Sequence, residues 1–527
     1  MFDFQKILAF CRKPNFILGL ILFVFVLKGL VFALIIPVFQ GSDEYIHYAT
    51  VQYLAEPKDK TWPIKTEQRQ TQDTKDIPSY HFTEEIIAFS QLTESWNLSG
   101  EPHNRQVFDP ALIEANEKAM RSGKYAPRIS TYPPDVITRT TLAHQIAAGG
   151  EKLLSHKDFF FRYFTLRFLA IFYGLITLLC AYYISLWSGM KRKHSLLLTA
   201  IIAFQPMFSA TTAIINYDPL LIALFSLFLL AGTSIIVHGP RYISFIGLFL
   251  FALGAILTKG TGGILLILAI GLVAWVLRKY FRALSRLQKS AFFAVLLAFF
   301  ALLIFFPPLD YTATFSPLMR SDAGSALVSY FSNNIFDWGK IERTQITYWG
   351  TFGWLDTQLH PWVLSGIILV ELSSFLGFIL LIACLSRRSF SVGGPQKLIA
   401  LLKKGQRFFP AVLSRGYAKI KNNLTAEKTF LPKPELLIFF VASTILLQLT
   451  IRFYDWLGIF SNGEGVGLPG RYFLPNIIPH FLFLATGFGA LSKNARVFEF
   501  ILKILLLLMI LLSLYAIFLI IIPRYYL

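Results

Sequence analysis

Two adjacent carboxylates, Asp43 and Glu44, follow the first long apolar run of the chain, Phe16 to Phe39. Burial beside lipid disfavours the charged form of a carboxylate, and this favours a role as a general base. The pattern therefore predicts acid–base chemistry at the membrane edge, with both acids as catalytic candidates. The structural alternative is that Ser42 or Asp43 caps a following helix, Tyr45 to Leu54.

Two cations in glycine-rich stretches are candidates for binding a phosphate group. Arg471 and Tyr472 follow a glycine-rich stretch, and a guanidinium offers a planar, permanent charge. Lys259 lies in the stretch Thr258 to Gly263, between two short apolar runs. This stretch lacks the residue order of a phosphate-binding loop, so an ATPase is not predicted. The alternative for Arg471 is an interfacial arginine that contacts lipid phosphates.

Three further ionisable residues stand at or inside apolar runs. Asp218, in Asn216-Tyr217-Asp218-Pro219, either caps a helix or binds substrate. Lys28 and Glu371 fall well inside two runs, at similar depth when counted from one side. Because a charge in lipid normally pairs or serves a pathway, we expect an ion pair between these two residues, with a proton or ion path as the alternative.

Composition places these residues in a membrane protein. The chain has 527 residues, of which 55% are hydrophobic and 15% charged. With roughly 20 apolar residues per span, about eleven spans are predicted, so the expected fold is an all-α polytopic membrane protein. The fifth and sixth spans are short and could be tilted, re-entrant or one interrupted pair. The spans are Phe16–Phe39, Phe164–Trp187, Leu196–Ile214, Pro219–Val237, Ile243–Leu257, Ile264–Leu277, Ala291–Pro307, Trp362–Cys384, Leu436–Arg452, Tyr472–Ala490 and Phe498–Ile522.

Lysine and arginine cluster on alternate connections, which orients the chain by the positive-inside rule. The net charge of +19 is therefore mostly a topology signal, and a nucleic-acid partner is not expected. We expect residues 386–434 to form a basic amphipathic cytoplasmic loop that lies on anionic lipid.

The chain is therefore predicted to have five parts. They are residues 1–40 (N-terminus and first helix), 41–160 (external loop forming a small cap with the acidic motif), 161–308 (helices two to seven), 309–361 (second external loop) and 362–527 (helices eight to eleven).

Several short motifs occur in an order that resembles the bacterial membrane proteins of the domain-of-unknown-function 2142 family. Ser42 and Ile46 stand where that family usually has prolines, while His47 matches. The family is in turn similar to the GT-C glycosyltransferases, which use polyprenyl-phosphate-linked sugars. This resemblance implies a GT-C-like fold, Asp43 as base and Glu44 as its neighbour, with a divalent metal bound by the two acids in some members. The matching motifs are residues 42–48, 132–134, 216–218, 352–356 and 470–475.

We therefore expect a glycosyltransferase on the outer face of the bacterial cytoplasmic membrane. It would move a sugar from a polyprenyl-phosphate donor to a glycan, lipid or protein acceptor, with inversion. Arg471 and Lys259 would stabilise the departing lipid phosphate, and His47, Tyr132 and Asp356 would contact sugar or acceptor. The alternative is a transporter or flippase for a lipid-linked glycan or another envelope precursor.

Overall fold

A computed structural model of the chain describes most of its apolar helices. The described residues are 14–55, 140–280, 328–390, 432–462, 467–492 and 494–527, together with 85–86, 89–90, 98, 101, 103–105, 111, 114, 118, 430 and 465. The predicted seventh span, most of the predicted basic loop 386–434 and Tyr132 lie outside these residues.

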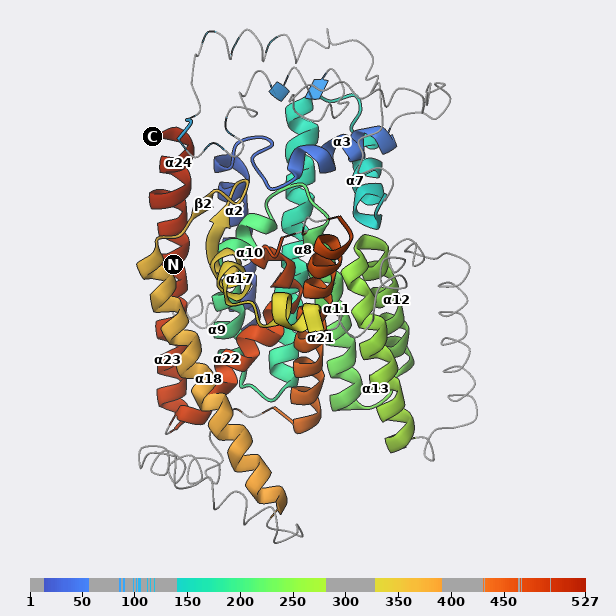
Figure 1. Cartoon of the computed structure of the whole chain (residues 1–527), viewed down its shortest axis with the longest axis vertical. Helices are drawn as coiled ribbons and strands as arrows, with labels where there is room; N and C mark the ends of the chain where they lie inside the picture. The colour runs from blue at the N-terminus through green and yellow to red at the C-terminus, as the bar shows by residue number, and fades with distance from the viewer. Residues whose placement is uncertain are drawn as a thin grey trace, which may run out of the picture.

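Helices dominate the described part of the chain (Figure 1). Their apolar composition over lengths of 17 to 30 residues explains the helical bundle, because a helix satisfies its own backbone hydrogen bonds in lipid. In chain order the elements are α2 (Pro14–Ile35), α3 (Glu44–Ala55), α7 (Leu142–Leu153), α8 (Phe159–Trp187), α9 (Arg192–Ala203), α10 (Pro206–Thr211), α11 (Asp218–His238), α12 (Tyr242–Thr258), η2 (Gly260–Gly263), α13 (Ile264–Tyr280), η3 (Phe331–Ile335), α17 (Trp338–Gly350), β1 (Thr351–Phe352), β2 (Thr357–Gln358), α18 (Pro361–Phe390), α21 (Pro434–Asn462), η5 (Gly470–Asn476), α22 (Ile477–Leu491), α23 (Ala495–Tyr515), η6 (Ala516–Ile521) and α24 (Ile522–Tyr526).

Within the described residues, eight helical segments are long and apolar enough to cross a membrane. The helix α11 is the most buried of them, because 78% of its 18-residue apolar stretch lies inside the protein. The corresponding share for α18 is only 17%. Thus α11 lies at the centre of the bundle and α18 at its periphery. The eight segments are Pro14–Ile35, Phe159–Trp187, Asp218–His238, Gly260–Lys279, Pro361–Ala383, Pro434–Ile459, Gly470–Leu491 and Ala495–Tyr526.

The predicted third span, Leu196 to Ile214, is not one helix. The chain breaks after α9, and α10 begins at Pro206. Proline lacks an N–H and moves the preceding residue out of the helical region, and Gln205 accordingly has ψ 119°. The Gln205 amide caps α10 and donates to Tyr348 O at 2.8 Å, so the break is tied to α17.

The short fifth and sixth spans form two separate helices, α12 and α13, joined by the 3₁₀ turn η2. Gly262 in this turn lies against the backbone of Ala255, where a Cβ would clash. The turn brings Lys259 to the same end of the bundle as Asp218, at the start of α11, and the two residues form an ion pair.

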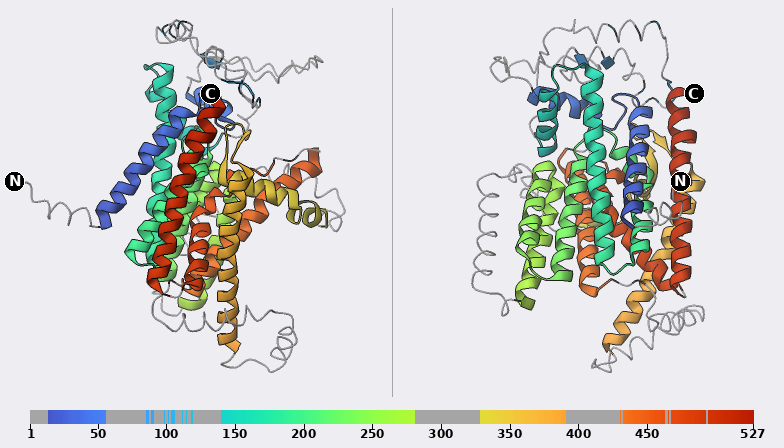
Figure 2. Two further views of the ribbon diagram at one scale, coloured as in Figure 1. Left: turned by 90° about the vertical axis from the view of Figure 1, so that its left-hand side faces the viewer. Right: turned by 180° about the vertical axis from the view of Figure 1, so that it is seen from behind.

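Two 12-residue helices, α3 and α7, pack against each other at one end of the bundle, beside the extended end of α8 (Figure 2). Aromatic rings fill the space beneath them. Phe39 contacts the rings of Tyr48 and Tyr163 at centroid distances of 6.2 and 5.4 Å, and Phe159 stacks on Tyr163 at 5.7 Å. This aromatic cluster fixes the position of the turn between α2 and α3, where the acidic pair lies.

Candidate functional site

Asp43 and Arg471 meet at the junction of α2, α3 and η5. Arg471 Nη2 donates to Asp43 Oδ2 at 2.7 Å. The arginine side chain is 3% exposed, whereas the carboxylate of Asp43 is 39% exposed. The backbone of Asp43 is left-handed, with φ 59°, a conformation that costs energy for a non-glycine residue and that aspartate tolerates better than most. The turn thus presents one carboxylate to the surface above a buried guanidinium.

Asp218 and Lys259 extend this pair into a network of two carboxylates and two cations. Lys259 Nζ donates to Asp218 Oδ1 at 2.9 Å, and Arg471 Nε lies 3.4 Å from Asp218 Oδ2. The rings of Tyr217 and Tyr472 flank Lys259, with its Nζ 4.5 and 3.6 Å from the ring centroids. The four predicted site residues Asp43, Asp218, Lys259 and Arg471 therefore form one network with a formal charge near zero.

The Asn216-Tyr217-Asp218 turn is fastened to the acidic turn. Asn216 Nδ2 donates to Ser42 O at 3.2 Å, and Asn216 Oδ1 accepts from Asp218 N at 3.0 Å. Asp218 is thus the first residue of α11 and also an ion-pair partner. The predicted capping role of Asp218 is therefore wrong, because Tyr217 stands at the N-cap position and the side chain of that residue does not cap the helix.

Arg471 retains hydrogen-bonding capacity. Among the described residues, its Nε and Nη1 atoms make no hydrogen bond, and Asp218 Oδ2 also accepts none. Beside the guanidinium lies a cavity of about 20 Å³, lined in part by Ser42, Thr211 and Thr351. The hydroxyls of both threonines are likewise buried and unpaired within the described part of the chain. This set of donors suits a small anionic or phosphoryl oxygen.

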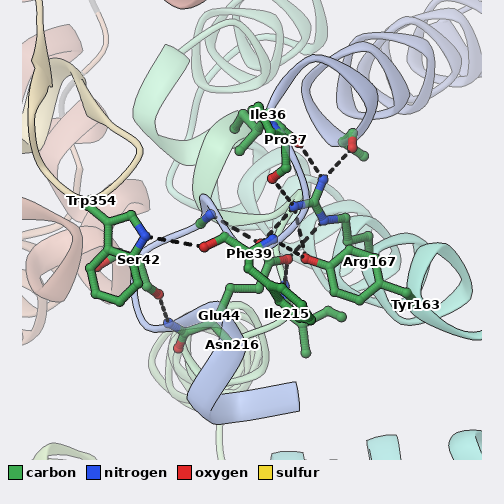
Figure 3. Close-up of polar contacts among 12 residues, drawn as sticks. Ile36, Pro37, Phe39, Ser42, Glu44, Tyr163, Arg167, Ile215, Asn216 and Trp354 are labelled. Carbon is green, nitrogen blue, oxygen red and sulfur yellow. Dashed lines mark hydrogen bonds and ion pairs between the residues drawn. The ribbon is translucent and has the colours of Figure 1, made fainter. Parts of the chain in front are cut away.

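Glu44 points into the protein, toward Arg167 (Figure 3). It is fully buried, and its two oxygens accept from Arg167 Nε and Nη2 at 2.8 and 2.7 Å. The backbone N–H groups of Gly41 and Ile215 complete its hydrogen bonding at 3.1 and 2.9 Å. Glu44 thus anchors the turn by pairing with the buried Arg167, and this geometry favours a structural role over the predicted catalytic one.

A shared metal site does not fit this geometry. Both oxygens of Glu44 are engaged by Arg167 and by backbone N–H groups, so the adjacent acids cannot present two carboxylates to one ion. The described residues contain no cluster of three or more His, Cys, Asp or Glu side chains that could hold a metal. The structure therefore gives no support to metal binding by Asp43 and Glu44 together.

His47 lies one helical turn after Asp43 and is paired with His144 of α7. His47 Nδ1 lies 2.8 Å from His144 Nε2, and the ring of Tyr217 packs edge-on at 4.6 Å from the His47 ring. Burial, with smaller contributions from His144, Arg471 and Lys259, lowers the pKa of His47 well below its usual range. Burial alone lowers the pKa of His144 to about 4. The two imidazoles are therefore neutral near pH 7 and link α3 to α7.

Asp356 is engaged elsewhere. Its carboxylate accepts from Arg524 Nη2 and Thr357 Oγ1, both at 2.9 Å. Arg524, near the end of α24, also donates to the backbone oxygens of Leu98, Glu101 and Asn104. Asp356 thus joins the β1–β2 turn to the last helix and to the segment after α3, and this contrasts with its predicted contact with a sugar.

The predicted ion pair between Lys28 and Glu371 is wrong. Lys28 Nζ donates to Ala203 O, where α9 ends, and lies 4.9 Å from the centroid of the Phe204 ring. Glu371 is bonded instead to Gln345, Trp349 and His480. Equal depth did not make the two residues neighbours, because depth leaves the direction around each helix undefined.

Sequence reasoning also missed Arg167, Tyr163, His144 and Arg524. For Arg167 a signal was present: an arginine four positions into the predicted span Phe164 to Trp187 requires a buried partner. Its partner lies 123 positions away. His144 and Arg524 carried no such signal.

The fold and the network at its end define a polytopic α-helical membrane protein with a charged site between helices. The chain belongs to the family described as "Predicted membrane protein (DUF2142)", which it matches over residues 25–403. The predicted family is thereby confirmed. No curated protein and no solved structure matches the chain.

Proposed function

We propose that this protein is a glycosyltransferase that uses a lipid-phosphate-linked sugar. The observation that carries the proposal is the pairing of an exposed carboxylate, Asp43, with a buried arginine, Arg471, that keeps unused N–H donors. One group suits a proton acceptor and the other suits a departing phosphate. The two groups are paired at 2.7 Å in the resting site, so the sugar carbon has to enter between them for a displacement in which base and leaving group lie on opposite faces.

In the proposed reaction, Asp43 accepts the proton of the acceptor hydroxyl. The hydroxyl oxygen forms a bond to the anomeric carbon from the face opposite the leaving group, giving inversion. The bond between that carbon and the phosphate oxygen breaks, and the lipid phosphate leaves with the electron pair. Arg471 and Lys259 offset the charge that develops on it.

The ion pair couples these two events. In the resting site the guanidinium of Arg471 donates to Asp43 Oδ2. When Asp43 becomes protonated, its attraction for the guanidinium falls. The positive charge of Arg471 is then available to the phosphate at the moment when the phosphate gains charge.

Tyr472 and Lys259 would complete the phosphate side of the site, since the ring lies 3.6 Å from Lys259 Nζ. His47, neutral and buried, would orient the turn or contact the sugar. The lysine and arginine distribution supports an active face outside the bacterial cytoplasmic membrane. Membrane lipids, a polyprenyl-phosphate sugar and a glycan, lipid or protein acceptor are the proposed partners.

A transporter or flippase is the second candidate function. The observation that favours it is a cavity of about 950 Å³ beside α18, whose wall includes the ionisable residues Glu371 and His480. Lys28 does not support it, because this residue is buried against Ala203 and Phe204.

The test compares lipid-linked sugars and envelope glycans by mass spectrometry in a deletion strain that carries the wild type, Asp43→Asn or Asp158→Asn. Asp43→Asn keeps the shape of the side chain but removes the base, so we expect transfer to fall about a hundredfold or more. Asp158 caps α8, and asparagine caps equally well, so this control should transfer normally. Full transfer by Asp43→Asn, at equal protein level, would refute the assignment, and glycans that are unchanged in the deletion strain would favour transport.

A further inference from the structure

A second polar cluster lies on α17, α18 and α22, away from the acidic network. Trp349 Nε1 donates to Glu371 Oε1 at 3.1 Å, and the amide of Gln345 donates to Glu371 Oε2. His480 Nε2 lies 3.0 Å from Glu371 Oε1, and His480 Nδ1 lies 2.8 Å from Tyr348 Oη. The carboxylate, which belongs to α18, is thus oriented by neighbours from two other helices, α17 and α22.

This cluster lies deep in the membrane-spanning part of the protein. Glu371 is the eleventh residue of α18, about 15 Å from its first residue at 1.5 Å per residue. That distance is about half of a hydrocarbon core roughly 30 Å thick. An ionisable group at this depth is costly unless it is paired or serves a ligand or a path.

Glu371 and His480 border the cavity of about 950 Å³ beside α18. Their side chains are 20% and 27% exposed, so the cluster is accessible from the cavity. Most of the remaining wall is apolar, and two of its side chains, Leu372 and Phe375, are more than half exposed on the outer face of α18. The cavity is thus a membrane-facing space with one polar cluster on its wall.

The charge of the wall selects the ligand. Among the described residues, the lining includes the carboxylates of Glu342 and Glu371 but no lysine and no arginine. It also includes aromatic rings, among them Trp338 and Trp349, whose faces attract cations. The apolar side chains of the wall suit a hydrocarbon chain, and its carboxylates and aromatic rings suit a protonated amine. The wall is therefore complementary to an amine attached to a hydrocarbon chain.

We propose that this cavity binds an amphiphile that carries a protonated amine. The ammonium group contacts the carboxylate of Glu371, and the hydrocarbon chain lies along the apolar side chains of α18 and α22. His480 orients the carboxylate through the contact of its Nε2 with Glu371 Oε1. None of these residues belongs to the acidic network, so the proposal does not depend on the proposed glycosyl transfer.

The test uses a photoactivatable dodecylamine with the purified protein in dodecyl maltoside, a detergent without charge. We expect saturable labelling of peptides from α17, α18 and α22, with competition by dodecylamine but not by dodecanol. The Glu371→Gln variant removes the negative charge and should reduce saturable labelling about tenfold or more, since hydrogen bonds between charged groups contribute this much. Glu435→Gln, an exposed carboxylate at the start of α21, is the matched control and should label as the wild type does.

A second variant separates binding from folding. Ile368 lines the cavity and is 38% exposed, so Ile368→Trp reduces the space while leaving Glu371 unchanged. This variant should also lose saturable labelling. Equal competition by dodecanol would overturn the proposal, because charge would not matter. Equal competition by ethylamine at the same concentration would overturn the proposal in favour of a small-cation site. Saturable labelling that persists in both Glu371→Gln and Ile368→Trp would also overturn it, because the ligand would then bind elsewhere.

Discussion

The substitution Glu44→Gln tests whether the second acid of the motif is structural. Glu44 accepts four hydrogen bonds, two from Arg167 and two from backbone N–H groups. An amide in either orientation turns an NH₂ group toward two of these four donors. Two hydrogen bonds are lost, and the guanidinium keeps a buried charge without its counterion. Breaking a buried pair in this way costs about 3–5 kcal/mol.

The measurement is the free energy of unfolding of the purified protein in detergent, compared with wild type. The matched control is Glu499→Gln. Glu499 pairs with Lys193 and Lys503, whose side chains are 59% and 61% exposed. A pair of this kind contributes about 0–1 kcal/mol. The expected difference between the two substitutions is therefore several kcal/mol for the same chemical change.

The double variant Glu44→Gln with Arg167→Met should recover part of the loss. Recovery is incomplete because Arg167 also donates to the backbone oxygens of Ala33, Ile36 and Pro37. A loss for Glu44→Gln as small as that for Glu499→Gln would refute the reasoning. Loss of glycosyl transfer in folded Glu44→Gln protein of wild-type stability would instead return Glu44 to the catalytic candidates.

Three further outcomes are expected. Arg471→Lys keeps the charge but loses the planar group, so lipid-phosphate binding and turnover should both weaken, whereas Arg343→Lys should change neither in the same assays. The native pKa of His144, about 4, lies below its usual value near 6.5, so the unfolded chain takes up a proton first and stability should fall as the pH decreases from about 6.5 to 4. A His144→Gln variant should lose part of that pH dependence, and an unchanged profile would contradict a buried neutral imidazole. An impermeant thiol reagent on intact cells should label Asn97→Cys and not Asn423→Cys, and the reverse pattern would invert the orientation.

Much of the helical framework could be predicted from the sequence. Long apolar runs require helices in lipid, and the runs beginning at Phe16, Phe164 and Pro219 each correspond to one helix. The prediction of one helix for the third run failed, because averaged hydropathy does not register a break at Gln205-Pro206 between two largely apolar helices. Proline chemistry was the better guide at that position.

The site could be predicted only in part. The motifs around Asp43, Asp218, Lys259 and Arg471 were each recognised, and the structure brings all four side chains together. Their partners could not be assigned, because the direction of a side chain around its helix depends on tertiary packing. The same limit explains why Glu44 was read as a catalytic neighbour and not as the partner of Arg167.

The separation of Asp43 and Arg471 along the chain has a consequence for biosynthesis. The two residues are 428 positions apart, whereas Glu44 and Arg167 are separated by only 123. At about 5–20 residues per second, a ribosome needs roughly 20–90 s to pass from one end of the Asp43–Arg471 pair to the other. The Glu44–Arg167 pair can therefore form early in synthesis, whereas Asp43 can pair with Arg471 only near the end of synthesis. A nascent chain that stalls before residue 471 can hold both Glu44 and Arg167 and still lack Arg471, one of the four residues of the charged network.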